Sequence, residues 1–99
     1  MSDAADAAGR QALAALERAL AGKPRRDGEA FSEATEHLCR MRDALIDHCR
    51  QGAQGRREGL GEVNAIISSA LAGHFPLGET PWPEVRGAAE HLRALLAKS

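Results

Sequence analysis

The chain has 99 residues, which is enough for one domain with a modest core but not for that core together with a deep substrate cavity. Its 13 basic and 14 acidic residues give a formal net charge of −1. This near balance disfavours nucleic acid or an acidic membrane as the main partner, because both are usually met by a basic surplus. Because so short a chain has little room for a substrate cavity, we expect a single domain over residues 1–99 that is not an enzyme and uses no cofactor. The patterns described below predict that this domain is helical.

The N-terminus lacks the basic start and long apolar run of a signal peptide, and no stretch approaches the roughly 18 apolar residues of a membrane span. Cys39 and Cys49 lie in one predicted helix with Cα atoms about 15 Å apart, too far for a disulfide. Free thiols fit a reducing compartment, so we expect a cytoplasmic protein. The abundant Ala, Gly and Arg suggest a bacterial source.

The first predicted helix runs from Ser2 to Ala21. Leu13, Leu16 and Leu20 recur in it at helical spacing and form one apolar stripe among many alanines. The segment 22–24 (Gly-Lys-Pro) ends this helix, because glycine and proline both disfavour its continuation.

The second predicted helix follows an N-cap at Asp27 and runs to about Arg50. Its apolar face holds Phe31, Ala34, Leu38, Met41, Leu45 and Cys49. The opposite face is charged and holds Glu33, Glu36, Arg40, Asp43 and Asp47. This pattern predicts an amphipathic, half-exposed helix.

The third predicted helix follows a glycine-marked turn at residues 51–55, could begin within 56–59, and runs to about Ala72. It is the most apolar of the four, and its expected inward face holds Leu60, Val63, Ile67, Ala70 and Leu71. Ile66 falls outside that stripe. The helix is therefore either flanked on two sides or presents Ile66 to a partner.

Residues 73–83 hold three of the chain's four prolines, its only Trp and one of its two Phe. Proline restricts the backbone, so we predict a rigid loop here. Exposure of Phe75, Leu77 and Trp82 together would be costly, so the loop should fold back onto the bundle or onto a partner. Trp82 is expected to be buried next to Phe75 or the start of the next helix; the alternative is an exposed docking residue.

The fourth predicted helix starts with Pro83 at its first position and runs to about Lys98. Its apolar face holds Val85, Ala88, Ala89, Leu92, Leu95 and Leu96. Four helices with one apolar stripe each and short links predict an all-α, antiparallel four-helix bundle, with the Pro/Trp loop between the third and fourth helices.

Two groups of side chains could bind a ligand. His37, Met41 and Cys49 lie at the edge of the apolar face of the second helix and offer soft-metal donors, although further ligands would be required. Asn64 and His74 are expected on the inward face of the third helix. There they would either bond to a facing helix or to the backbone of the Pro/Trp loop, or form a polar pocket together with Ser68. The simpler interpretation in both cases is structural.

The leading functional hypothesis is a small non-catalytic interaction or adaptor protein, and the expected partner is another protein or a second copy in a homodimer. The surplus of large apolar residues supports it, with the expected contact residues Ile66, Phe75, Leu77 and Trp82. The alternative is a ligand- or metal-responsive sensor that uses one of the two groups of polar side chains.

Overall fold

A computed structural model describes residues 2–50 and 59–98, apart from the side chains of Cys49 and Arg50. Within these residues the chain forms four helices and no strand: α1 (Asp3–Ala21), α2 (Gly28–Arg50), α3 (Leu60–His74) and α4 (Trp82–Ala97). The predicted all-α fold is confirmed. The predicted turn at residues 51–55 lies outside the described residues.

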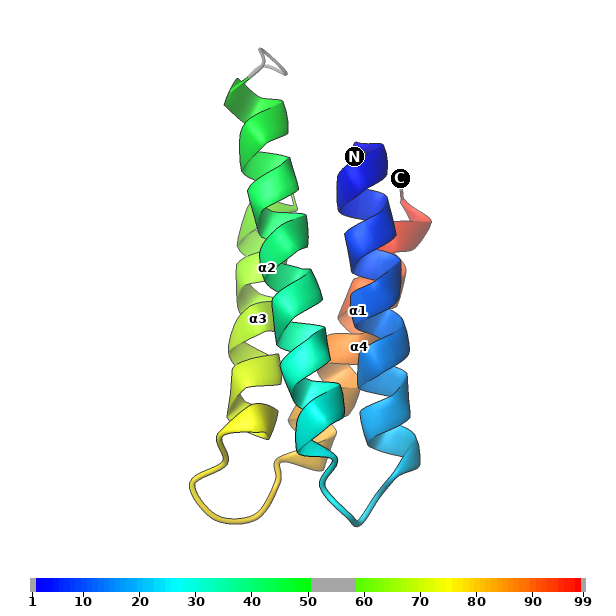
Figure 1. Cartoon of the computed structure of the whole chain (residues 1–99), viewed down its shortest axis with the longest axis vertical. Helices are drawn as coiled ribbons and strands as arrows, with labels where there is room; N and C mark the ends of the chain where they lie inside the picture. Colours follow the sequence, from blue (N-terminus) through cyan, green and yellow to red (C-terminus); the bar gives the residue numbers. More distant parts are fainter. Residues whose placement is uncertain (1, 51–58, 99) are drawn as a thin grey trace.

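The helices form an antiparallel bundle in which the chain runs down α1, up α2, down α3 and up α4 (Figure 1). Helix α1 packs against α2 and α4, and α3 packs against the same two helices. The bundle measures 44 × 21 × 19 Å. The α1–α2 and α3–α4 loops lie together at one end of it (Figure 1).

Small residues bring α1 close to its neighbours. Its buried positions are alanines, one glycine and one leucine: Ala5, Gly9, Ala12, Ala15, Leu16 and Ala19. A Cβ atom at Gly9 would lie 2.8 Å from Cδ2 of Leu96 and 3.0 Å from Sδ of Met41. Gly9, unfavourable for an isolated helix, therefore permits close packing against both α2 and α4.

The helix ends agree with the predicted ends to within a few residues. Asp27 caps α2 as expected, because its Oδ1 accepts a hydrogen bond of 3.0 Å from the Ala30 N–H. Helix α3 extends past the predicted end to His74. Helix α4 begins at Trp82, one residue before the predicted first position at Pro83.

Helix α3 is rotated from the predicted face. Its buried residues are Val63, Ile66, Ile67, Ala70 and Gly73. Ile66 is 1% exposed, which agrees with the alternative that α3 is flanked on two sides and not with Ile66 as a contact residue, and Leu71 is 39% exposed, so its expected inward position is wrong. Ile66 and Leu71 are five residues apart, so they point in directions about 140° apart around the helix axis. They therefore cannot both face the core. The face that carries Gly73 is the buried one, which selects Ile66.

The outer surface is linked by ion pairs between neighbouring helices. Arg18 of α1 forms an ion pair with Glu33 of α2. The hydrogen bond that Arg18 donates to the Glu33 carboxylate raises the pKa of Arg18 above its ordinary value. Arg93 and Glu17 join α4 to α1 at 2.9 Å. Such exposed pairs add little to stability individually. In the part of the chain that the structure describes, no helix is long and apolar enough to cross a membrane.

Candidate functional site

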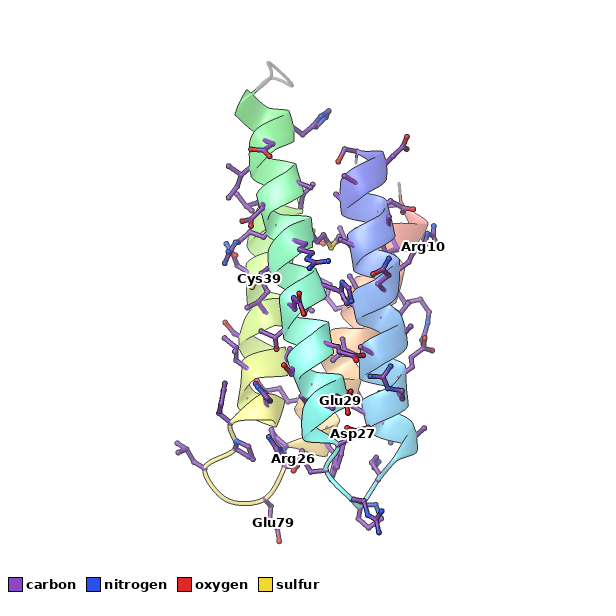
Figure 2. The ribbon with its side chains drawn as sticks, viewed as in Figure 1. Arg10, Arg26, Asp27, Glu29, Cys39 and Glu79 are labelled. Carbon is purple, nitrogen blue, oxygen red and sulfur yellow. The ribbon has the colours of Figure 1, made fainter. Side chains whose placement is uncertain are left out.

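The C-terminal end of α3 is held by the loop between α1 and α2. Arg26 of that loop donates from Nε to the Gly73 carbonyl at 3.1 Å and from Nη2 to the His74 carbonyl. The last carbonyls of a helix have no partner within the helix and carry partial negative charge. A guanidinium group supplies both the missing hydrogen-bond donors and a compensating positive charge. Figure 2 shows Arg26 at the end of the bundle where both loops meet.

An aromatic contact lies directly behind this anchor. Phe31 of α2 is fully buried, and its ring centroid lies 6.1 Å from that of Trp82. A Cβ atom at Gly73 would overlap Cε1 of Phe31 and lie 2.9 Å from its Cζ, so the backbone of α3 rests on this ring. Lys23 Nζ lies 5.9 Å from the centroid of the Trp82 ring, within the range of a cation–π contact.

Three apolar side chains are exposed at the same end of the molecule. They are Leu71, 39% exposed, Phe75, 68% exposed, and Leu77, 107% exposed, and we call them the end cluster. The Phe75 N–H donates to the Leu71 carbonyl at 2.8 Å, which continues the helical hydrogen-bond pattern from α3 into the loop. The centroid of the Phe75 ring lies 4.1 Å from that of His74. The end cluster thus begins on an anchored helix end.

The exposed side of α3 that leads to the end cluster carries no charge. It consists of Gly61, Asn64, Ala65, Ser68 and Leu71. The exposed side of α4, in contrast, holds Glu84, Arg86, Glu90, Arg93 and Lys98. Glu62 lies at the margin of this surface, and its Oε2 atom is 3.5 Å from the Nε2 atom of His91 on α4. The uncharged strip distinguishes α3 from the solvated faces of its neighbours.

The predicted contact residues separate into two groups. Phe75 and Leu77 are exposed, so the loop does not fold them back onto the bundle, and the other expected outcome, contact with a partner, stays a prediction. Trp82 is half-buried and packs against the core, but its aromatic neighbour is Phe31 rather than Phe75. Trp82 therefore packs against the core beside Phe31, whereas Phe75 and Leu77 remain exposed. That the loop is rigid remains a prediction.

The structure describes two of the three possible soft-metal donors on α2, so a site that includes Cys49 stays a hypothesis. Met41 is fully buried beside Gly9, whereas His37 is half-buried on the same helix. The side chain of Cys49 lies outside the described part. Among the residues that the structure describes, no group of three or more His, Cys, Asp or Glu side chains could hold a metal ion.

The expected inward position of Asn64 on α3 is wrong. Asn64 and Ser68 are exposed because the rotation of α3 that buries Ile66 turns them outward. Ser68 Oγ donates instead to the Asn64 carbonyl at 3.2 Å. His74 is half-buried, and its buried Nδ1 atom has no hydrogen-bond partner within the described protein.

Sequence reasoning misses two residues of this end. Leu71 continues an apolar stripe and so resembles a core residue, and only the position of Gly73 against Phe31 reveals the other rotation. Arg26 resembles part of a solvated loop. Its partners lie 47 and 48 positions away, and no local pattern signals such a contact.

The comparisons with known proteins add no family to this geometry: no family model, no curated protein and no solved structure matches the chain.

Proposed function

We propose that this chain is a small, non-catalytic helical interaction or adaptor protein that binds another protein through the end cluster. The observation that carries the proposal is the exposure of Leu71, Phe75 and Leu77 together at one end. They are the large apolar side chains of the described residues that are exposed by more than a third. Scattered exposed apolar residues are ordinary, whereas grouped ones mark interaction sites.

The scaffold beneath the end cluster supports this proposal. Arg26 fixes the end of α3 through two carbonyls, and Phe31 supports the backbone at Gly73. A surface held in one position loses less conformational entropy on binding than a mobile one. The free thiol of Cys39 is compatible with the cytoplasmic location that we also propose.

Photo-crosslinking in the cells that produce the protein tests this function. A benzoylphenylalanine at position 77 should give a discrete protein adduct, whereas the same residue at exposed Gln11 on α1 should not. Phe75→Ser in the position-77 variant should abolish the adduct, since it removes apolar contact area from the same surface. Equal adducts at positions 77 and 11, or none at position 77, would reject the proposal.

A ligand-responsive sensor is the second candidate, and one observation favours it. The buried Nδ1 atom of His74 has no protein partner among the described residues, and a bound ligand could supply one. Metal analysis of the purified protein, together with the His74 ring resonances in an NMR titration with Zn²⁺, tests this candidate. Unchanged resonances and no copurified metal would reject its metal-responsive form.

A further inference from the structure

The loop between α3 and α4, residues 75–81, projects from one end of the bundle, and we call it the arch (Figure 1). Phe75 and Leu77 are exposed, so these apolar side chains do not fix the arch to the core. Among the residues that the structure describes, no hydrogen bond joins residues 76–79 to any other part of the chain. The position of the arch therefore depends on how its two ends are held.

Both ends of the arch are held by one segment, residues 22–27 between α1 and α2, which we call the strap. Before the arch, Arg26 donates hydrogen bonds to the carbonyls of the last two residues of α3. After the arch, the Lys23 Nζ atom lies 5.9 Å from the centroid of the Trp82 ring. The two cations are three positions apart in the sequence, so one short segment contacts both ends of the arch.

The two holding contacts are joined through aromatic rings. Trp82 packs against Phe31, with 6.1 Å between ring centroids, and the Arg26 Cζ atom lies 5.9 Å from the Phe31 centroid. A closed circuit of contacts therefore begins and ends in the strap, and it runs through Lys23, Trp82, Phe31 and Arg26. Contacts that share a short segment are not independent, because loss of one lowers the effective concentration of the other. Two prolines also restrict the backbone of the arch, so we expect its two ends to open together.

We propose that the strap is a conformational device that holds the arch in place, with Lys23 and Arg26 as its positioning residues. Release of either cation frees both ends of the arch and weakens the binding of a partner to the end cluster. A surface that moves loses more conformational entropy on binding than a fixed one. The effect on binding rests on the proposed interaction function and adds its control, whereas the holding of the arch is a property of the chain alone.

Amide hydrogen exchange of the full chain, followed by NMR, tests the strap. The Phe75 N–H donates to the Leu71 carbonyl at 2.8 Å, at the start of the arch. The Val85 N–H donates to the Pro81 carbonyl at 3.0 Å, at its end. These two amides therefore report the two ends separately. In the native chain both should exchange faster than the amide of Leu38, a fully buried core residue, because the arch opens without the bundle.

Lys23→Gln and Arg26→Gln each remove one cation of the strap. Either loss should accelerate exchange about two- to fivefold, and at both Phe75 and Val85 in each variant, because the two ends open together. Lys23→Arg keeps a cation beside the Trp82 ring and should restore the native rates.

The control is Arg25→Gln, an exposed residue between the two cations, which should leave both rates unchanged. Circular dichroism establishes that all variants fold. Acceleration only at the end nearest each substitution would show independent contacts and overturn the strap. Unchanged rates in Lys23→Gln and Arg26→Gln would overturn it too, as would end amides that exchange as slowly as that of Leu38 in the native chain.

The yield of the position-77 adduct tests the effect on binding. It should fall at least about twofold in Lys23→Gln and Arg26→Gln and stay native in Arg25→Gln and Lys23→Arg. Faster exchange at both ends with a native adduct yield would overturn the effect on binding. If the native chain gives no adduct at all, the interaction function fails, while the exchange rates alone still decide whether the strap holds the arch.

Discussion

Arg26 and Gly73 are 47 positions apart in the chain, and the Arg26 Nε atom donates a hydrogen bond of 3.1 Å to the Gly73 carbonyl. The contact joins the first loop of the bundle to the helix end that precedes the third loop. Both loops lie at the same end because the helices alternate in direction (Figure 1). The end cluster is therefore positioned by a residue from the opposite half of the sequence.

Arg26→Ala should lower the stability of the protein by about 1 kcal/mol, since it removes a charged donor from two helix-end carbonyls that water can then reach. Arg26→Lys should restore only part of this loss, because an ammonium group lacks the fork of donors that serves both carbonyls. Urea unfolding followed by circular dichroism measures both values. Arg25→Ala, one residue away and exposed, is the matched control and should change little.

Gly73→Ala should destabilise the protein by about 1–3 kcal/mol, because the new methyl group would overlap the Phe31 ring. Phe31→Leu removes the ring and should make the same glycine substitution less costly. A double-mutant cycle by urea unfolding measures this coupling. Additive effects would mean that α3 shifts away from Phe31 rather than resting on it.

Gly61→Ala and Gly87→Ala should each stabilise the protein by about 0.5–1 kcal/mol, because alanine restricts the unfolded chain and favours a helix more than glycine does. Both glycines lie within helices, and among the described residues no atom from another part of the chain lies within 4 Å of the added methyl group. Thermal melts followed by circular dichroism measure this effect. A loss of stability at Gly61 would contradict the placement of this residue on the outer side of α3.

The sequence predicted the bundle because its helices are separated by strong signals: an N-cap at Asp27, prolines, and glycine-marked turns. It failed at the rotation of α3. Ile66 and Leu71 are equally apolar, so the local pattern permits two buried faces. Contact between Gly73 and Phe31, which lie 42 positions apart, decides between them. The exposure of Leu71 follows from this rotation and could not be predicted without it, whereas Phe75 and Leu77 are expected as contact residues from the sequence.

Trp82→Ala should destabilise the protein by about 2 kcal/mol, less than the roughly 3–5 kcal/mol typical of a fully buried aromatic residue, because Trp82 is only half-buried. The lost contact is with Phe31, at 6.1 Å between ring centroids. Trp82→Phe should keep much of this contact and most of the stability. In the native protein the Trp82 fluorescence maximum should lie between the values of buried and fully hydrated indole, and iodide should quench it only in part. Full quenching, with unchanged stability in Trp82→Ala, would instead place this ring on the binding surface with the end cluster.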